Sequence, residues 1–498
     1  MAFAQAYVPY MATQTSTPLL ANYVGGEWVP VEASERLDNV NPATGEVVAR
    51  VPLSGTADVD AAARAAREAF PAWRATSPIV RARAVMKLRT VLSEHHEELA
   101  RLVTADMGKT FDDAFGEVGR GIESVEAATA VPHLLKGENL EGVASGLDVE
   151  MVRQPVGVVA AITPFNFPAM IPLWFLPFAI ACGNTFVLKP SEQDPRPGVR
   201  IMELIDGIDE IPPGVVNLVL GAHDAVNALL DHPEVDAISF VGAAATARYI
   251  ATRATENGKR VQALGGAMNS IVVMPDADPK LMVNGVLGSA FGAAGQRCLA
   301  GSVAVLVGTR DEQDAMRDRI VEAAAKLRTG DGSDPTTDVS PLVSVAARER
   351  VEGEIETAVG DGAKLVLDGR GDGGRGGAEL GATVLDSVPG ESRAAREELF
   401  GPVLSLVRVA TLDEAIEWTN AGRYGNSAMI FTSSGGAARE FRFGIEAGMV
   451  GVNVGVAAPV AWFPFGGWKE SIDADQYANG TDAIDFYTRK KVVTSRWK

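Results

Sequence analysis

Apolar residues follow two different rhythms along this chain, and the change of rhythm predicts its architecture. Between Arg36 and about Ala127 they recur at helical spacing, so residues 59–73 and 80–107 are predicted as amphipathic helices. From Val152 onward, short and nearly continuous apolar runs alternate with helix-sized segments. This alternation predicts an α/β fold with a parallel, doubly wound sheet. Its strands are expected at residues 156–162, 185–188, 215–220 and 237–241.

A second series of apolar runs follows Gly265-Gly266 and predicts another α/β domain, with a hinge near residue 260. Open sheets of this kind bind ligands at the carboxyl ends of their strands, so a nucleotide site is expected in the first domain. The strands of the second domain are expected at residues 270–274, 303–307, 403–407 and 428–431.

Near the C-terminus, Ile484-Asp485-Phe486-Tyr487-Thr488 is followed by Lys490-Lys491-Val492-Val493-Thr494. This stretch is predicted to be a strand that needs a pairing partner, which another subunit could supply.

Composition narrows the class of protein. Only two cysteines in 498 residues exclude a disulfide framework and favour a reducing compartment, with the cytoplasm as the default. A net charge of -19 disfavours nucleic acid or an anionic membrane as a partner.

The chain shows no sign of a membrane span, a targeting segment or a metal site. Its longest apolar stretch, Ala169 to Gly183, is interrupted by prolines and is shorter than the roughly 20 residues that a span needs. The first positive charge is Arg36, which leaves no basic leader. The five histidines show no metal-ligand spacing.

Six separated motifs, taken together, resemble the signature blocks of the aldehyde dehydrogenase superfamily. Each block alone is a weak signal, but six in this order are highly specific, and the resemblance extends from about Tyr23 to the end of the chain. The motifs are Thr163-Pro164-Phe165-Asn166-Phe167-Pro168, Leu188-Lys189-Pro190-Ser191-Glu192, Phe240-Val241-Gly242, Gly295-Gln296-Arg297-Cys298, Glu397-Glu398-Leu399-Phe400-Gly401-Pro402 and Pro464-Phe465-Gly466-Gly467.

The resemblance implies a Rossmann-like NAD-binding domain, an α/β catalytic domain and a small β oligomerisation element that makes a homo-oligomer, a tetramer or a dimer. The expected divisions are a flexible tail at 1–22, the NAD-binding domain at 23–127 and 150–260, the catalytic domain at 261–465, and the oligomerisation element at 128–149 and 478–498.

Cys298 is the candidate nucleophile. Its tetrapeptide alone would fit a buried structural cysteine, and the resemblance favours catalysis. A thiolate that attacks an aldehyde forms a tetrahedral adduct, which can release hydride to a nicotinamide and leave a thioester. The adduct's oxyanion needs a fixed donor, which the Asn166 amide and the Cys298 N–H can supply, although Asn166 could instead cap a turn.

Six residues are expected to bind NAD. The resemblance places Lys189 and Glu192 at the adenosine ribose, where a carboxylate favours NAD over NADP because it repels a 2′-phosphate. Gly242, before a helix, is expected to present N–H groups to the pyrophosphate. The full set is Phe165, Lys189, Glu192, Gly242, Glu398 and Phe400.

The main departure from the family pattern lies at Ala263. Hydrolytic members have a glutamate there that activates the deacylating water, whereas a methyl group cannot accept a proton. The thioester is therefore expected to wait for a thiolate such as coenzyme A.

A sub-family lacks that glutamate, the acylating methylmalonate-semialdehyde and malonate-semialdehyde dehydrogenases, and further stretches of this chain resemble it, including Gly451-Val452-Asn453-Val454. Arg297 and Arg120 match the two arginines that bind the substrate carboxylate there, and a guanidinium can bind a carboxylate through two parallel hydrogen bonds. Either arginine could instead be structural. The implied products are acetyl-CoA or propionyl-CoA, CO₂ and NADH.

Two other functions remain open at this stage. In one, another carboxylate replaces the missing glutamate and the enzyme hydrolyses its thioester to a carboxylic acid. In the other, the protein keeps the fold and binds without catalysis; a Cys298 no more reactive toward iodoacetamide than Cys182 would favour it.

Overall fold

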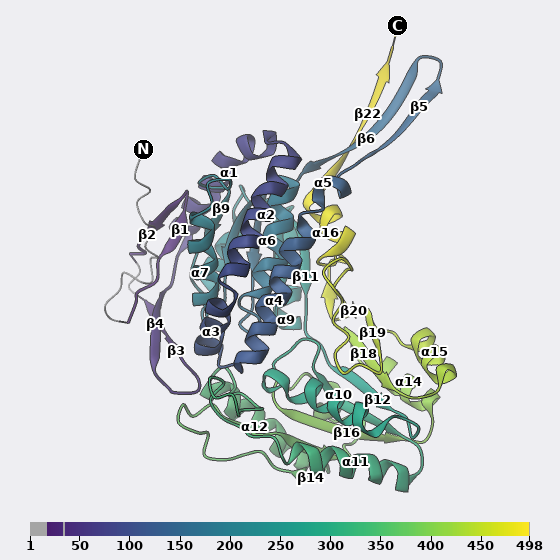
Figure 1. Ribbon diagram of the computed structural model, residues 1–498. Coiled ribbons are helices and arrows are strands. Elements are labelled where there is room, and N and C mark those ends of the chain that lie inside the picture. The colour runs from purple at the N-terminus through teal and green to yellow at the C-terminus, as the bar shows by residue number, and fades with distance from the viewer. Residues whose placement is uncertain (1–16, 33–34, 498) are drawn as a thin grey trace.

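The strands predicted in the first half of the chain form one sheet (Figure 1). The computed structural model describes residues 17–32 and 35–497. Four predicted strands pair in parallel at the centre of this sheet, which confirms the α/β, doubly wound architecture. In spatial order the sheet contains β2 (Glu27–Val29), β1 (Asn22–Val24), β9 (Val216–Leu218), β8 (Thr185–Lys189), β7 (Val158–Ile162), β10 (Ala237–Val241), β11 (Arg260–Leu264) and β21 (Ile472–Asp473).

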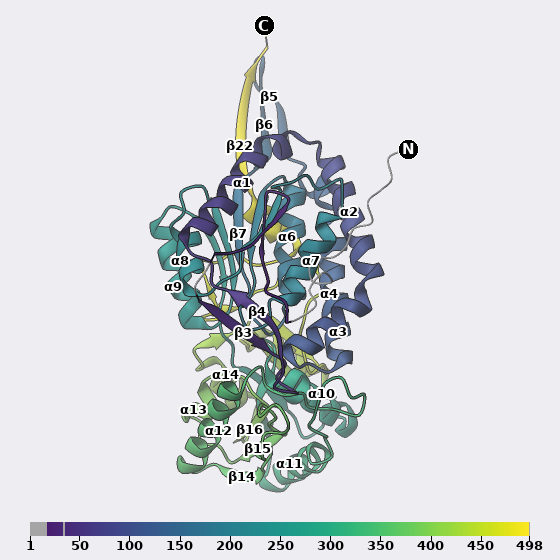
Figure 2. The same ribbon diagram turned by 90° about the vertical axis from the view of Figure 1, so that its left-hand side faces the viewer.

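Helices cover both faces of this sheet, which is why its strands read as continuous apolar runs. In β7, Val158 and Ala160 face one apolar cluster, while Val159 and Ala161 face the other. Figure 2 shows the two helical layers on either side of β7. The first layer contains α1 (Thr56–Ala75), α8 (His223–Asp231) and α9 (Ala244–Glu256). The second contains α2 (Pro78–Glu94), α3 (His96–Met107), α4 (Phe111–Ala128), α5 (Val131–Leu134), α6 (Met170–Cys182) and α7 (Arg196–Asp206).

The second predicted domain is also built on a sheet. All its strand pairs are parallel except that of β14 with β15. In order it contains β14 (Lys364–Leu367), β15 (Thr383–Asp386), β16 (Val403–Val409), β13 (Gly301–Val307), β12 (Asn269–Val273), β18 (Ser427–Phe431) and β19 (Met449–Val452). Its helices are α10 (Pro279–Phe291), α11 (Arg310–Ala324), α12 (Val345–Gly360), α13 (Arg393–Arg396), α14 (Leu412–Asn420) and α15 (Gly435–Gly444).

Two domain limits differ from their predicted positions. Strand β11 still pairs with β10 of the first sheet, so the chain crosses between the sheets at residues 265–268 rather than near 260. The predicted tail extends too far, because Leu20 and Ala21 are buried and β1 begins at Asn22. Residues 1–16 of that tail lie outside the described residues.

The predicted C-terminal strand is wrong over its first half. Residues 484–487 belong to helix α16 (Gly480–Tyr487), which buries Ala483, Ile484 and Tyr487 at helical spacing. Such a short apolar run does not distinguish the two structures. Strand β22 (Thr488–Arg496) follows and pairs within the same chain, along the whole of β6 (Leu147–Pro155).

Strand β6 also pairs with β5 (Glu138–Ala144), and the resulting three-stranded sheet projects from the body of the molecule (Figure 1). Every residue of β5 is exposed. Both outer strands, β22 and β5, therefore present open edges to a further chain.

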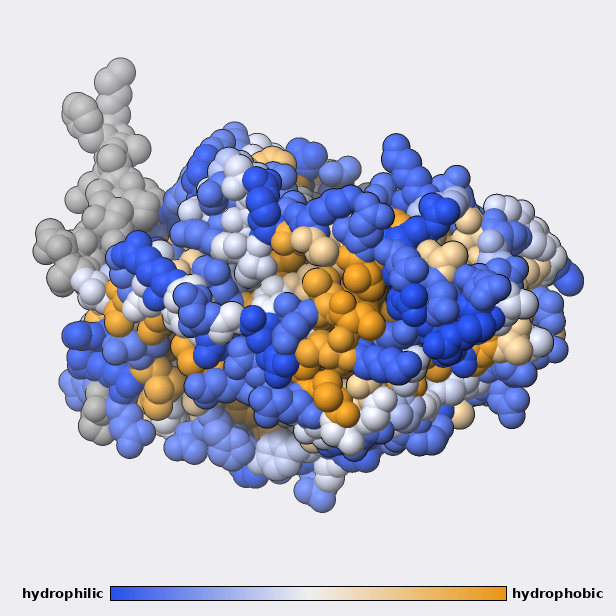
Figure 3. Space-filling model, turned by 90° about the horizontal axis from the view of Figure 1, so that it is seen from below, coloured by the Kyte–Doolittle hydropathy of each residue, from blue (hydrophilic) through white to orange (hydrophobic). Residues whose placement is uncertain are grey.

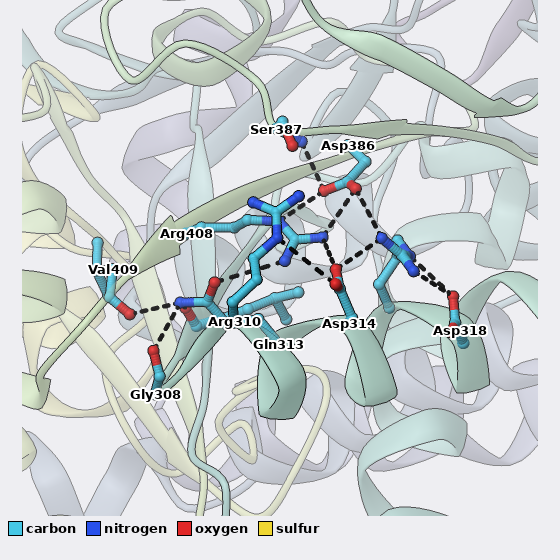
Figure 4. Close-up of polar contacts among 11 residues, drawn as sticks. Gly308, Arg310, Gln313, Asp314, Asp318, Asp386, Ser387, Arg408 and Val409 are labelled. Atoms are coloured by element: carbon cyan, nitrogen blue, oxygen red, sulfur yellow. Dashed lines mark hydrogen bonds and ion pairs between the residues drawn. The ribbon is translucent and has the colours of Figure 1, made fainter.

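A charged cluster joins α11 to strands β15 and β16 (Figure 4). Arg408 donates from Nε and Nη2 to Asp386 at 2.9 and 2.8 Å, and its Nη2 lies 2.8 Å from Asp314 on α11. Gln313 donates to the Val409 carbonyl at 2.8 Å. The cluster therefore fixes the helix against the sheet with charge-assisted hydrogen bonds.

The lower end of the molecule in Figure 1 is formed by β14, α11 and α12. Seen from that side, an apolar area lies in the middle of the face, among hydrophilic surface (Figure 3). The exposed large apolar residues of these elements are Val345, Val359 and Val366. The outer strand β14 is thus only partly covered.

Within residues 17–32 and 35–497, no helix has both the length and the apolar composition that crossing a bilayer requires. The same residues contain no group of three or more His, Cys, Asp or Glu side chains placed to hold a metal ion.

Candidate active site

Two cavities meet at Cys298. One, of about 340 Å³, lies between α4, the start of α6 and residues 456–461. The other, of about 560 Å³, lies over the carboxyl ends of the first sheet's parallel strands, where the topology predicted a nucleotide site. Cys298 lines both cavities, so a ligand in either one can reach the same sulfur.

The backbone around Cys298 is tightly constrained. Ala293, Ala294 and Gly295 all have positive φ, of 49°, 53° and 69°. A Cβ on Gly295 would collide with the carbonyl of Gly401, so glycine is required where these two motifs touch. The Cys298 carbonyl accepts hydrogen bonds from Asn269 and Asn426 at 2.8 Å each. These contacts fix the backbone that carries the thiol.

Burial controls the acidity of the thiol. The pKa of Cys298 is raised to about 12, chiefly by burial and also by the Glu398 charge, against the lowering effects of the N–H groups of Cys298 and Leu299 and of the Lys109 charge. Without a bound ligand, the group is therefore a thiol at neutral pH. Cys182, the other cysteine, is fully buried in the apolar core.

Asn166 lies against the nucleophile segment. Its side chain is buried, lines the larger cavity with Cys298, and donates from Nδ2 to the Gln296 carbonyl at 3.0 Å. The Asn166 amide, which is the predicted oxyanion donor, is thus held against the backbone of Gln296, two residues before Cys298 in the chain.

All six residues proposed for NAD line the larger cavity: Phe165, Lys189, Glu192, Gly242, Glu398 and Phe400. The Lys189 ammonium lies 2.9 Å from the Glu192 carboxylate. The Phe165 and Phe400 rings meet edge to face, with centroids 5.8 Å apart. The residues predicted to contact the adenosine and those predicted to contact the nicotinamide therefore line the same cavity.

The predicted role of Gly242 needs correction in one respect. Its own N–H donates to the Leu264 carbonyl at 3.1 Å and is not directed to a ligand. The N–H groups that a phosphate could reach belong to the first turn of α9, whose N-cap, Ala243, makes no side-chain capping bond. A Cβ at 242 would overlap the Phe240 ring, which explains the glycine sterically.

Glu398 is a buried carboxyl group in the same wall. It accepts a hydrogen bond from the Ala267 N–H at 3.1 Å. Burial raises its pKa to about 7, against the lowering effects of that bond and of Arg350. The carboxyl group is therefore half protonated near neutral pH.

Arg120 and Arg297 both line the smaller cavity, and both are already paired with a carboxylate. Arg297 bonds through Nη2 to Asp113, while Arg120 bonds to Glu123 at 2.5 Å and to the Pro459 carbonyl. Each pair occupies only part of a guanidinium group that has five N–H donors.

One charged face of α4 was predicted only in part, because the sequence pointed to Arg120 and not to its neighbours on that face. Asp113, Glu117 and Arg120 stand at intervals of four and three residues and all line the smaller cavity, as does Lys109 just before the helix. Helical spacing of charged residues was the signal that could have revealed this face. The structure shows that it forms the wall opposite Cys298's own segment.

Ala263 is fully buried in strand β11 and belongs to the apolar cluster that includes Ile162 and Phe240. Its methyl group adds no polar atom to either cavity. The nearby Gly265 and Gly266 line the larger cavity instead.

Comparison with known proteins gives a consistent result over almost the whole chain. The model of the aldehyde dehydrogenase family matches residues 28–493. Malonate-semialdehyde dehydrogenase 1 of Geobacillus kaustophilus (strain HTA426) is 49% identical over 487 residues, covering 97% of this chain and 99% of that protein. Malonate-semialdehyde dehydrogenase 2 of Bacillus anthracis is 48% identical over 490 residues and covers 98% of this chain and 100% of that protein.

Solved structures agree with this. The methylmalonate-semialdehyde dehydrogenase of Oceanimonas doudoroffii matches with a TM-score of 0.94 and 45% identity, covering 97% of this chain and 99% of that one. A Sinorhizobium meliloti 1021 protein, described as a methylmalonate-semialdehyde dehydrogenase complexed with NAD, matches with a TM-score of 0.95 and 43% identity, with the same coverage.

Proposed function

This chain belongs to the aldehyde dehydrogenase family, and we propose that it oxidises malonate semialdehyde or methylmalonate semialdehyde with NAD and passes the acyl group to coenzyme A. The observation that carries the proposal is the junction at Cys298. One cavity there offers two arginines for a carboxylate, and the other contains the residues expected around NAD. Relatives at 49% and 48% identity are named for malonate semialdehyde, which supports the substrate class.

The larger cavity suits NAD. Its volume of about 560 Å³ falls within the range of pockets that bind small molecules. Glu192 and Glu398 can accept hydrogen bonds from ribose hydroxyls, and the first turn of α9 can donate to the pyrophosphate. NAD, when bound, supplies the acceptor for the hydride that leaves the substrate carbon.

The smaller cavity would orient the semialdehyde. Free donors of the Arg120 and Arg297 guanidinium groups bind its carboxylate, so its aldehyde carbon points to Cys298. Cys298 attacks as the thiolate, after the thiol proton has passed to solvent. Sγ then forms the C–S bond while the carbonyl π bond breaks, and the developing oxyanion is stabilised by Asn166 Nδ2 and the Cys298 N–H. Loss of hydride from this adduct leaves an acyl thioester on Cys298.

The acyl group then carries a carboxylate β to the thioester carbonyl. Cleavage of the bond to this carboxylate releases CO₂, and the electron pair forms an enolate that the same oxyanion donors stabilise. Protonation at carbon gives an acetyl or propionyl thioester. Attack by the coenzyme A thiolate makes a new thioester and expels the Cys298 thiolate.

Coenzyme A is the proposed acceptor because the expected base for water is missing. Ala263 presents only a methyl group, buried among apolar side chains. Two acidic groups of the smaller cavity are engaged, Asp113 with Arg297 and Glu117 with Lys109 at 2.6 Å. An ionised thiol, in contrast, attacks without a general base.

Hydrolysis to a carboxylic acid is the alternative, and one observation favours it. Glu398 has a pKa of about 7, suited to a general base, and lines the cavity with Cys298. The same carboxyl is the expected partner of the nicotinamide ribose. Hydrolysis would need Glu398 to exchange that role for activation of water after NADH leaves.

The deciding experiment follows NADH formation from malonate semialdehyde with and without coenzyme A. Without it, we expect a burst of about one NADH per subunit and then almost no turnover, because the thioester persists. With it, turnover should continue, and mass spectrometry should identify acetyl-CoA. Undiminished turnover without coenzyme A, with a free acid as product, would establish the hydrolytic alternative. Methylmalonate semialdehyde, run in parallel, should give propionyl-CoA.

We also propose that the enzyme works in the cytoplasm as a homo-oligomer. Both cysteines are free, which suits a reducing compartment. The open strand edges of β22 and β5 support assembly through the projecting sheet. Light scattering after gel filtration tests this: a monomer would contradict the proposal, and a dimer or tetramer would support it.

A further inference from the structure

We propose that the buried ion pair of Lys109 and Glu117 positions Asn166, and thereby sets the rate at which the Cys298 thioester forms. This inference deepens the proposed function, but only at the acylation step. Both residues are positioning residues: they act through the loop that carries Asn166.

The pair holds this loop from two sides. Lys109 Nζ donates to Glu117 at 2.6 Å and to the backbone carbonyl of Asn166 at 2.5 Å. The other oxygen of Glu117 accepts the N–H groups of Ala169 and Met170 at 2.9 and 3.2 Å, where α6 begins. Three backbone groups within five residues are thus attached to one ion pair.

Burial and several contacts hold the ion pair in one position. The side chains of Lys109 and Glu117 are 1% and 0% exposed. The ammonium also lies 3.7 Å from the centre of the Phe167 ring, between the two anchored ends of the loop. A buried charge with this many partners has a single low-energy position, so the loop it holds is fixed as well.

A short path of contacts leads from the pair to the nucleophile. The carbonyl of Asn166 is bound to Lys109, and its side-chain amide is bound to the Gln296 carbonyl at 3.0 Å. Gln296 is itself held, because its Oε1 accepts the Val343 N–H at 3.1 Å. A shift of the Asn166 backbone would therefore move the oxyanion donor relative to Cys298.

The ionic character of the pair also has an electrostatic effect. Lys109 lines the smaller cavity with Cys298, and its positive charge lowers the pKa of that thiol. Burial, in turn, lowers the pKa of Lys109 itself, and the Glu117 charge and hydrogen bond oppose this. This direct effect is smaller than that of burial, of the Glu398 charge and of the two N–H groups, so the main role of the pair is to hold the Asn166 loop.

The test is a double-mutant cycle on the acylation step. Single-turnover NADH formation, with enzyme in excess over semialdehyde, is measured for Asn166→Ala, Lys109→Met and the double variant. Asn166→Ala should slow this step by about 10²–10³-fold, as expected for loss of an oxyanion donor. Lys109→Met should slow it by about 10–100-fold with an unchanged KM, since the donor is displaced rather than removed.

In the Asn166→Ala background, Lys109→Met should cost less than about threefold further, because only the small direct effect of its charge on the Cys298 thiol then remains. Multiplying effects in the double variant, or an unchanged rate in Lys109→Met, would overturn the proposal. Single turnover precedes acceptor choice, so this result is independent of whether coenzyme A or water completes the reaction.

A second variant covers the case in which Lys109→Met does not fold. Glu117→Gln keeps an acceptor for the Ala169 and Met170 amides but removes the ion pair. It should slow single turnover about threefold to tenfold, and this effect should also vanish in the Asn166→Ala background. A slow rate that persists there would contradict the proposal.

Arg200→Met is the matched control. Arg200 is 7% exposed and lies 2.9 Å from the fully buried Glu203 on α7, and neither residue lines either cavity. This variant should lower the thermal midpoint as Lys109→Met does, but leave the single-turnover rate unchanged. An equal slowing in the control would show that the effect is loss of stability and would overturn the positioning role.

Discussion

The Glu398 carboxylate raises the pKa of the Cys298 thiol, and both residues line the cavity assigned to NAD. Burial is the larger cause, and the Glu398 charge adds to it. Because the pKa of Glu398 is itself about 7, the charge beside the sulfur changes across the neutral range. The reactivity of the nucleophile is therefore coupled to the protonation of one carboxyl group.

Removal of this charge should make Cys298 more reactive. We expect Glu398→Gln to lower the pKa of the thiol, although burial keeps it above the ordinary value, and to speed alkylation by iodoacetamide in the pH range above 7, where Glu398 is ionised. The measurement is the alkylation rate against pH for the protein without ligands. Glu322→Gln removes an exposed carboxylate that lines neither cavity; it is the control and should leave the profile unchanged. A slower reaction in Glu398→Gln would contradict this coupling.

Introduction of the missing base should partly restore hydrolysis. We expect Ala263→Glu to raise the rate of NADH formation without coenzyme A, because a carboxylate then stands where hydrolytic members have one. The same change buries a carboxyl group in an apolar cluster, so stability to urea should fall. Ala263→Gln has the same shape without a base. It should show the loss of stability but no hydrolytic turnover.

The two arginines should matter only for substrates that carry a carboxylate. We expect Arg297→Gln and Arg120→Gln each to raise the KM for malonate semialdehyde about 10–100-fold. This factor corresponds to the loss of one charge-assisted hydrogen bond, which contributes about 1.5–3 kcal/mol to binding. Propionaldehyde, which lacks the carboxylate, is the control substrate. Its kcat/KM should change less than about threefold, and an equal loss for both aldehydes would assign the arginines a structural role.

The Asp386 and Arg408 pair should stabilise the second domain without affecting chemistry. Asp386 and Arg408 are 2% and 9% exposed, and neither residue lines the two cavities. Asp386→Ala leaves Arg408 with Asp314 as its remaining carboxylate partner, and the loss of two charge-assisted hydrogen bonds should lower the free energy of unfolding by about 1–3 kcal/mol, measured with urea. Glu322→Gln, which removes the exposed pair with Lys326, is the control and should show no measurable change.

The contribution of Asp386 should also depend on pH. Burial raises its pKa, but the bonds from Arg408 outweigh this and hold the pKa below its ordinary value. The stabilisation is therefore complete above the ordinary pKa of an aspartate and is lost as the pH falls through the lower value of the folded state. Urea midpoints from pH 3 to pH 7 should fall at the acidic end in the parent protein and be flatter in Asp386→Ala.

The apolar pattern predicted which segments form the two sheets more reliably than it predicted where each strand or helix begins and ends. Strands β7, β8 and β10 read directly as apolar runs because both faces of the sheet are buried. Residues 484–487 were also predicted as a strand but form a helix, since four residues span little more than one helical turn and contain too little pattern to distinguish the two. Tertiary packing decided that case.

The sequence by itself determined the chemical inventory of the site: the Cys298 thiol, the Asn166 amide, two arginines and no acidic group at residue 263. Each motif is a short run of residues, and the order of the motifs along the chain can be read without coordinates. Only the tertiary structure decided how these groups are held. Lys109 meets the Asn166 carbonyl across 57 positions, and Arg297 meets Asp113 across 184. Contacts over such separations depend on how helices pack on a sheet, which no local pattern encodes.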